Sequence, residues 1–552
     1  MHLRTCISIA LACAFGQYGV RGADSTPVAT APHLEKRGHA EQLMVDGKPF
    51  LILGGEVYNN SASSLEYMKP IWPRLAAMHL NTVLVPISWA QLEPVEGRFD
   101  YTLVDGLIRE ARGQNLRLVP LWFGSWKNTW SSYAPDWVKR DFDRFPRVQL
   151  RNGSGTERLS PLSHVNCEAD ARAFAALMRH LREIDSAVHT VIMMQVENEV
   201  GVIPDARDHS PEANIAYDRP VPRELMEYLQ QHRDSLDAEF HEKWRTAGFK
   251  ISGNWEAVFG PGLETEDLFM AWQYARYIGK VAAAGKAEYN LPMFANAALI
   301  RPDYAPGQYN SGGPLPHSFD FWKAGGPQLD FLAPDIYFEF KKWSSRYDRP
   351  RNPLFIPEAA GDAQGAANVF YAVGQHRSLG FSVFAIDGMG SSGDGGKELA
   401  GSYDVLSQLS ALILENQPKG RVAGVLLEDL TPSQNVQLGD YTLHVSGGGP
   451  RRTFPGEPVS PDPPGRQTPH GIFIAAATDE FYMAGSGLTI TVSADKPGPP
   501  MVGLATVEEG RFVDGRWVRG RTLAGDDTGQ GNSVSLRGAA AGTLRVTIYR
   551  YR

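Results

Sequence analysis

The chain has 552 residues, which is too long for one ordinary hydrophobic core and predicts two or three domains. Its composition, with 43% hydrophobic and 21% charged residues, is typical of a soluble globular protein. The formal net charge of -8 is spread without long runs of one sign. This argues against a nucleic acid or an anionic membrane as a partner, because both require a basic face.

The first residues are similar to a secretory signal peptide. Arg4 precedes an apolar stretch over about 6–20, and the small residues Gly22 and Ala23 follow it. We therefore expect residues 1–23 to be a signal peptide. The protein is then expected to be exported to the periplasm or the cell surface.

The cysteines and the later apolar segments limit other arrangements. Cys13 leaves a lipoprotein as an alternative to soluble export. Beyond the leader, Cys167 is the one remaining cysteine, which excludes an internal disulfide and a cysteine zinc motif. No later segment is long and apolar enough to predict a membrane span. The sequence leaves the oligomeric state open.

Strands and helices are predicted to alternate after a Pro-, Ala- and Thr-rich segment over 24–44, which we expect to be flexible. Eight segments read as buried strands, at 49–56, 81–89, 116–126, 191–196, 291–298, 329–338, 354–361 and 381–388. Helical spacing occurs between them, as in Val104, Leu107 and Ile108. Near-continuous apolar strands that alternate with helices indicate a parallel sheet, and eight of them predict a (β/α)8 TIM barrel over 45–419. A doubly wound open sheet is the alternative.

The pattern changes after residue 419. Segments with period-two alternation, separated by Gly, Pro and Asp, replace the helical spacing. Asp514 and Gly515 are the pair typical of a tight hairpin. We expect residues 420–552 to form an all-β sandwich, so the predicted fold class is α/β with a C-terminal β domain.

Carboxylates dominate the predicted carboxyl ends of the strands, where the active sites of such barrels lie. The polar residues there are Glu56, Glu93, Glu197, Asn198, Glu199, Asp335, Tyr337, Glu358 and Asp387. No histidine motif for a metal and no Ser–His pair accompanies them. Glycoside hydrolysis fits this set, because it requires one carboxylic acid and one opposed carboxylate. We expect no metal and no organic cofactor.

Two motifs resemble the retaining β-glycosidases that share this barrel. They are "QVENEVG" (195–201) and "IPEAAG" (356–361). The resemblance implies that Glu199, at the end of strand four, is the acid/base and that Glu358, at strand seven, is the nucleophile. It also implies that Asn198 hydrogen-bonds the 2-hydroxyl of the sugar.

Within that group, the chain is similar to the β-galactosidases of glycoside hydrolase family 35 over about residues 45–390. The motifs are "ILGGEVYN" (52–59), "SWAQLEPVEGRFDY" (88–101) and the "NEVG" ending. The resemblance implies an exo-β-galactosidase that acts on a β-galactoside oligosaccharide. "APDIYF" (333–338) adds Tyr337, which such enzymes place near the nucleophile.

Strand three departs from that family. "LWFGSWKN" (121–128) stands where galactose-binding members commonly have Asn-Ala-Glu, and Pro86 stands where a tyrosine is expected. The sequence therefore supports the type of reaction better than the identity of the sugar. Galactose on xyloglucan side chains is one candidate substrate. Other retaining β-glycosidases, of the β-glucosidase, β-xylan or β-mannan type, and a non-catalytic carbohydrate-binding protein are the alternatives.

Further residues are expected to contact the substrate. Trp122 and Trp126 are predicted to line the cleft, although each could belong to the core. Glu56 is either a ligand of a sugar hydroxyl or a structural partner, and Glu197 is expected to be structural. Retention requires Glu199 and Glu358 to lie about 5–5.5 Å apart, whereas inversion needs about 6.5–9.5 Å.

Overall fold

The computed structural model describes residues 30–389, 394–428, 432–447, 468–537 and 541–552. The predicted signal peptide at 1–23 lies outside these residues and stays a prediction. Within the described ranges, no helix combines the length and the apolarity that a membrane span requires.

A small antiparallel sheet precedes the barrel. It is formed by β1 (His33–Arg37), β2 (Ala40–Val45) and β3 (Lys48–Phe50). The expectation of a flexible segment over 24–44 is therefore wrong from residue 33 onward. Leu43 and Val45 of β2 belong to the same apolar cluster as the residues inside the barrel, and this burial fixes the segment.

The central sheet is a parallel barrel. Its strands are β4 (Ile52–Glu56), β5 (Thr82–Ser88), β6 (Arg117–Lys127), β9 (Met194–Asn198), β10 (Met293–Ala298), β11 (Phe331–Ile336), β12 (Phe355–Ile356), β13 (Glu358–Ala359) and β14 (Gly380–Val383). They pair in the order β12-β14-β4-β5-β6-β9-β10-β11-β13. Pro357, which has no N–H for the ladder, separates β12 from β13. Because β12 pairs with β14 and β13 with β11, the two halves of this strand close the sheet, and the open-sheet alternative is excluded.

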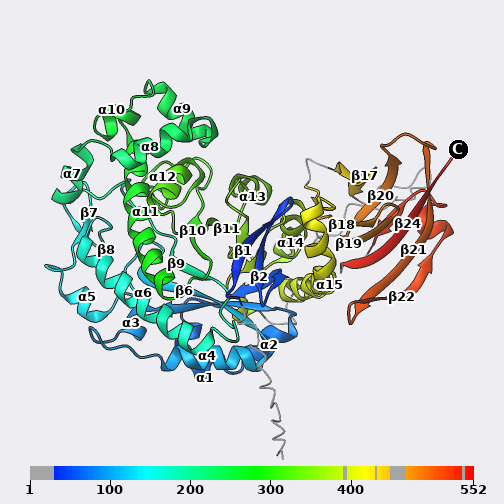
Figure 1. Cartoon of the computed structure of the whole chain (residues 1–552), viewed down its shortest axis with the longest axis horizontal. Helices are drawn as coiled ribbons and strands as arrows, with labels where there is room; N and C mark the ends of the chain where they lie inside the picture. The colour runs from blue at the N-terminus through cyan, green and yellow to red at the C-terminus, as the bar shows by residue number, and fades with distance from the viewer. Residues whose placement is uncertain (1–29, 390–393, 429–431, 448–467, 538–540) are drawn as a thin grey trace, which may run out of the picture.

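Helices surround the barrel (Figure 1). They are α1 (Leu65–Met68), α2 (Trp72–Ala77), α3 (Trp89–Leu92), α4 (Thr102–Gly113), α5 (Asp136–Arg140), α6 (His164–Asp185), α7 (Pro211–Asp218), α8 (Arg223–Gln231), α9 (Ala238–Thr246), α10 (Trp255–Phe259), α11 (Leu263–Glu288), α12 (Phe319–Gly325), α13 (Phe340–Tyr347), α14 (Ala363–Gln375) and α15 (Asp394–Asn416). The long helix α6 begins where the sequence supplies a cap, because the hydroxyl oxygen of Ser163 accepts from the N–H of Asn166. The short helices α7 to α10 form an excursion between β9 and α11, and a hairpin of β7 (Arg147–Gln149) and β8 (Gly155–Leu159) follows α5.

The C-terminal part is all-β, as predicted. One antiparallel sheet has the order β15 (Val422–Leu426), β18 (His470–Ala477), β19 (Glu480–Ser486), β24 (Gly542–Tyr551), β21 (Met501–Val513) and β22 (Arg516–Leu523). The other has the order β16 (Ser433–Leu438), β17 (Tyr441–Gly447), β20 (Leu488–Ala494) and β23 (Val534–Leu536). Residues of both sheets share one apolar cluster, which makes them a sandwich. Asp514 and Gly515, both with positive φ, form the predicted hairpin turn between β21 and β22.

The sandwich packs on the barrel through α14 and α15 (Figure 1). Ile472 and Ile474 of β18 belong to the apolar cluster that includes Phe370 of α14. Gly374 and Gly424 bring α14 and β15 into backbone contact, since a Cβ on Gly374 would lie 2.6 Å from the Cα of Gly424. The two parts therefore share a close apolar interface.

Candidate active site

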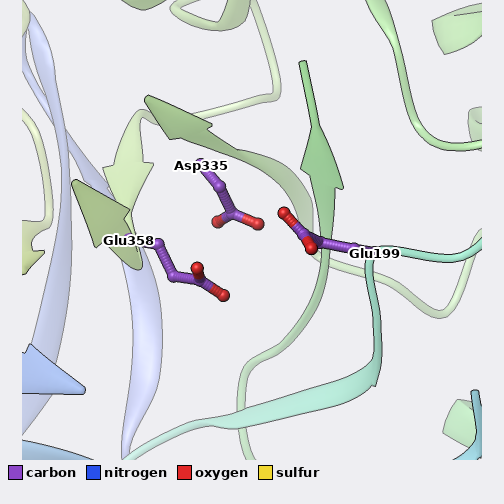
Figure 2. A group of neighbouring side chains, drawn as sticks. All are labelled: Glu199, Asp335 and Glu358. Atoms are coloured by element: carbon purple, nitrogen blue, oxygen red, sulfur yellow. The ribbon is translucent and has the colours of Figure 1, made fainter. Parts of the chain in front are cut away.

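Three buried carboxyl groups converge at the carboxyl ends of the barrel strands. Glu199 follows β9, Asp335 lies on β11 and Glu358 opens β13, and Figure 2 shows their carboxyl groups facing one another. One oxygen from each lies within 4.8 Å of the others. The structure thus brings the two predicted catalytic glutamates together and adds Asp335, which the sequence placed at a strand end without a role.

Two further predicted residues hold Glu358. The hydroxyl of Tyr337 donates to its Oε2 at 2.8 Å. The side-chain amide of Asn198 donates to its Oε1 at 3.4 Å. Both contacts fix the position of the Glu358 carboxyl group.

The backbone separates Glu197 from Glu199. A regular strand would point both side chains the same way, but both residues have left-handed φ values, 62° and 44°. Glu197 turns away from the site and accepts hydrogen bonds from the N–H groups of Ser125 (3.0 Å) and Trp126 (2.7 Å). Glu197 therefore braces the end of β6, as expected of a structural residue.

Asn296 on β10 positions Glu199, and sequence reasoning missed it. Its Oδ1 accepts from the N–H of Glu199 at 3.0 Å, and its Nδ2 donates to Oδ2 of Asp335 at 2.7 Å. The side-chain amide of Asn310 donates to the carbonyl of Glu199 at 2.8 Å. The available signal was an amide inside the apolar run "MFANAA" (293–298), because a buried amide requires partners.

The prediction that Trp122 and Trp126 line the cleft is wrong. Both are fully buried in the layer between the barrel and its helices. The indole N–H of Trp122 donates to Oδ1 of Asp170 on α6 at 2.8 Å, and that of Trp126 donates to the carbonyl of Leu159 at 3.0 Å. On β6 the alternate residues, including Phe123, face the barrel interior instead.

Glu56 lies in the site without a polar partner. It is fully buried at the end of β4, and within the described part of the chain neither of its side-chain oxygens has a hydrogen-bond partner. Burial, reinforced by Glu358, raises the pKa of Glu56 well above its ordinary value, against the effect of Lys127. Oδ1 of Asn198 and Oδ1 of Asp335 are unpaired in the same way. Such buried polar atoms are available to a polar ligand, because buried polar groups usually have hydrogen-bond partners.

Lys127, the last residue of β6, is a second residue that sequence reasoning missed. Its side chain is 6% exposed and its Nζ lies 4.0 Å from Oε1 of Glu358. It stands inside the "LWFGSWKN" motif that departs from the family 35 pattern. The signal was an ammonium at the buried end of an apolar strand, because such a charge requires a partner.

The electrostatics assign different protonation states to the carboxyls. Burial and the charge of Glu358 raise the pKa of Glu199 to about 7, although Lys127 and a hydrogen bond with Asp335 oppose the rise. Burial, Glu358 and Glu199 raise the pKa of Asp335 well above its ordinary value. Near neutral pH, Glu199 can therefore carry a proton and release it.

The same three carboxyls have a spacing that could hold a cation. The ammonium of Lys127, next to Glu358, already supplies a positive charge to this group. Burial and the neighbouring carboxyls also raise the pKa values of Asp335 and Glu199, and a carboxyl group that holds a proton is a poor metal ligand. These two features suit acid–base chemistry better than a resident metal.

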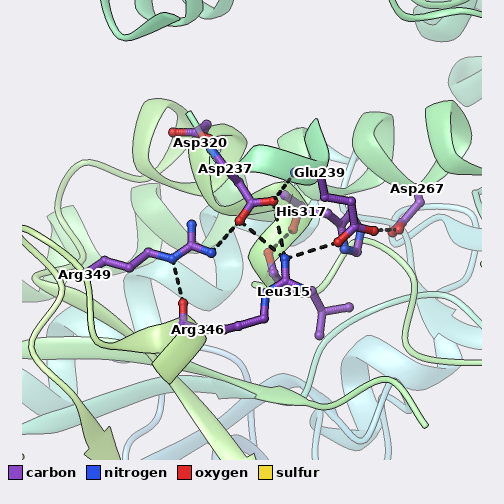
Figure 3. A network of polar contacts seen from close by, with 9 residues as sticks. Asp237, Glu239, Asp267, Leu315, His317, Asp320, Arg346 and Arg349 are labelled. Atoms are coloured by element: carbon purple, nitrogen blue, oxygen red, sulfur yellow. Dashed lines mark hydrogen bonds and ion pairs between the residues drawn. The ribbon is translucent and has the colours of Figure 1, made fainter. Parts of the chain in front are cut away.

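Asp267 and His317 belong to a polar network that also includes Asp237 and Arg346 (Figure 3). Oδ2 of Asp267 on α11 contacts the hydroxyl of Tyr309 at 2.6 Å and Nε2 of His317 at 2.7 Å. This fixes the segment that contains Asn310. A cavity of about 550 Å³ adjoins the network, and Tyr309 and His317 line it, but the three carboxyls do not.

Comparison with known proteins identifies the family. The glycoside hydrolase family 42 model, described as β-galactosidase, matches residues 58–349, more than half of the chain. The chain belongs to this β-galactosidase family. The resemblance to family 35 was therefore too specific, since the comparisons support family 42 and not family 35. A second model, a domain of unknown function, matches residues 399–535.

Individual relatives are distant. A β-galactosidase of Xanthomonas manihotis is 27% identical over 176 residues, which is 31% of this chain and 26% of that protein. The β-galactosidase structure from Bacillus circulans sp. alkalophilus has a TM-score of 0.46 at 14% identity, covering 66% of this chain and 57% of that one. The structure from Rahnella sp. R3 has a TM-score of 0.45 at 17% identity, covering 65% and 56%. The chain thus matches about a quarter of the curated relative's length and a little over half of these two structures.

Proposed function

We propose that the protein is a retaining exo-β-galactosidase, with Glu358 as the nucleophile and Glu199 as the acid/base. The observation that supports it is the pair of opposed carboxyls, whose nearest oxygens lie within 4.8 Å. This spacing suits direct attack by a carboxylate, whereas an inverting enzyme leaves about 6.5–9.5 Å for a water. The pKa of about 7 for Glu199 suits a group that must both donate and accept a proton.

The proposed reaction has two steps. Glu358 attacks the anomeric carbon while Glu199 gives its proton to the leaving oxygen, so that the glycosidic bond breaks and a glycosyl-enzyme forms. Glu199 then takes a proton from water, which attacks the same carbon and releases both the sugar and Glu358. Asn198 is the expected ligand of the 2-hydroxyl, because its Oδ1 is unpaired next to Glu358.

The proposed substrate is terminal β-linked galactose on a larger plant cell-wall oligosaccharide, such as a xyloglucan side chain. The strand-three motif supports this choice. Lys127 enters the site there, and Trp122 turns away from it. Comparison of kcat/KM for lactose and for galactosylated xyloglucan fragments tests the proposal, and equal values would contradict it.

The reaction itself is tested with a panel of aryl β-glycosides. We expect hydrolysis of the β-galactoside, and proton NMR should show that the first product keeps the β configuration. Glu358→Ala should be nearly inert but should form an α-galactosyl azide when azide is added. Glu199→Ala should still react with substrates that have good leaving groups, and azide should then give the β-galactosyl azide. A first-formed α product from the wild type would rule out the retaining assignment.

The panel also separates the alternatives. Preferred turnover of an aryl glucoside, xyloside or mannoside would indicate another retaining β-glycosidase on the same barrel. A non-catalytic carbohydrate-binding protein would turn over none of them. That alternative is less well supported, because Glu199 and Glu358 are both present and correctly opposed.

A further inference from the structure

The main chain of Lys127 is fixed at the edge of the site. Its N–H donates to the carbonyl of Trp130 at 2.8 Å, and its carbonyl accepts from the N–H of Trp130 at 3.0 Å. The next residue, Asn128, donates to the carbonyl of Asn198 at 3.2 Å. The Lys127 side chain therefore starts from a defined position beside the strand end that leads to Glu199.

The ammonium of Lys127 lies over two aromatic rings and next to Glu358. Nζ lies 5.2 Å from the ring centroid of Phe123 and 5.8 Å from that of Phe384. In the part of the chain that the structure describes, its polar contact is the 4.0 Å ion pair with Glu358, and it forms no hydrogen bond. A charge on a side chain that is buried to this degree is unfavourable unless an opposite charge balances it.

Four carboxyl groups lie close enough to Lys127 to balance its positive charge. Glu56, Glu199, Asp335 and Glu358 approach Lys127 from four different strand ends. The hydroxyl of Tyr133 lies near Lys127, and that of Tyr337 lies near Glu358. Burial lowers the pKa of Lys127, but the four carboxyls together outweigh burial and leave it above its ordinary value. Lys127 therefore stays a cation throughout the range in which a glycosidase works.

We propose that Lys127 is a positioning residue whose buried charge keeps Glu358 ionised beside three other carboxyl groups. The inference rests on the proposed function, in which Glu358 must be a carboxylate before it can attack. Without the ammonium, an ionised Glu358 would face Glu56, Glu199 and Asp335 with no positive charge next to its Oε1. Tyr337 contacts the other oxygen, so the two residues hold opposite sides of one carboxylate.

The first test is the pH profile of kcat/KM with an aryl β-galactoside for the wild type, Lys127→Met and Lys127→Arg. The acidic limb reports ionisation of the nucleophile in the free enzyme. Loss of an opposite charge at this distance should move the limb of Lys127→Met upward by about 1 to 3 pH units. Lys127→Arg keeps the charge and should stay near the wild type. A Lys127→Met profile that coincides with the wild-type profile, or that differs in KM alone, would overturn the proposal.

A second measurement needs no substrate. With the ammonium removed, ionised carboxyls lose their counter-charge, so the difference in Tm between the wild type and Lys127→Met should grow as pH rises from about 5 to 7. Lys323 is the control, because it is a half-buried lysine on α12 whose ammonium donates to the backbone carbonyl of Arg351 at 3.2 Å. Burial lowers its pKa to about 8. Lys323→Met should therefore show a nearly constant difference over that range.

The two measurements separate the outcomes. If the wild type hydrolyses no aryl β-glycoside, the proposed function fails and the Tm series alone decides the role of Lys127. If Lys127→Met does not fold, Lys127→Gln, which is uncharged but polar, replaces it in both series. A Tm difference that is independent of pH in the variant that folds would show that Lys127 only packs against its rings.

Discussion

Glu197 and Glu199 are separated by one residue, yet they have different surroundings and different chemistry. Glu197 accepts two backbone hydrogen bonds, and burial followed by the neighbouring Asp170 raises its pKa well above the ordinary value. Glu199 faces Glu358 and Asp335, with one oxygen of each within 4.8 Å of the others. The left-handed backbone at both residues turns their side chains apart. A structural carboxyl and a proposed catalytic one thus arise from one short motif.

The pKa of Glu199 predicts the basic limb of the pH profile. The acid must be protonated to assist departure of the leaving group, so kcat/KM should fall about tenfold per pH unit above about 7. The measurement uses a substrate with a poor leaving group, such as methyl β-galactoside. Glu199→Gln should lose this limb together with most of its activity. A wild-type profile that is flat up to about pH 9 would exclude Glu199 as the acid.

Strand β6 shows how an element decides which side chains meet the substrate. Its regular part alternates between the interior (Phe123) and the helix layer (Trp122), but its pairing with β9 shifts register between Trp122 and Lys127. Gly124 allows this irregularity, since a Cβ there would lie 2.3 Å from the indole nitrogen of Trp122 and 2.5 Å from Oε1 of Glu197. The strand can therefore bury Trp122 on the outside and still deliver Lys127 to the site.

The outward position of Trp122 predicts a stability effect without a binding effect. Trp122→Phe removes the donor to buried Asp170, and an unsatisfied buried acceptor costs about 1–3 kcal/mol. The free energy of unfolding in urea should fall by that amount. KM for an aryl β-galactoside should change less than about twofold, because the ring is remote from the substrate. A large rise in KM at unchanged stability would show that Trp122 contacts the substrate, contrary to its position in the structure.

At the scale of the whole molecule, the barrel and the sandwich form one packed unit. The helices α14 and α15 contact the barrel on one face and the sheet containing β15 and β18 on another. The main chain of Gly424 approaches α14 so closely that a Cβ there would lie 2.7 Å from the nitrogen of Gln375 and 2.8 Å from the carbonyl oxygen of Phe370. The sandwich therefore packs against α14, the helix that follows β13, and β13 contains Glu358.

This contact predicts that Gly424→Ala destabilises the protein. The added methyl group must displace backbone atoms, and overpacking of this kind costs about 1–3 kcal/mol. Differential scanning calorimetry should show a lower Tm. Gly401→Ala on α15 is the control, because its Cβ meets nothing within 4 Å and should be neutral or slightly stabilising. If both variants unfold like the wild type, the two parts are not tightly packed.

The sequence by itself determined the features that depend on local order. Eight apolar runs predicted the barrel strands, the position of carboxylates at their ends predicted Glu199 and Glu358 as candidates, and an Asp-Gly pair predicted the hairpin at 514–515. The strand and hairpin predictions are confirmed, because strand formation, burial of an apolar run and turn geometry each depend on neighbouring residues.

Only the tertiary structure decided which side chains meet. Lys127, Asn296 and Asp335 come from different strands, and closure of the barrel brings them to one site. The same closure buries Trp122 outside the barrel and packs residues 40–45 against its interior. A side chain at an irregular strand end points where its φ and its neighbours across the barrel direct it. Residues adjacent in the chain do not determine this direction, because it results from contacts between segments that are far apart in the sequence.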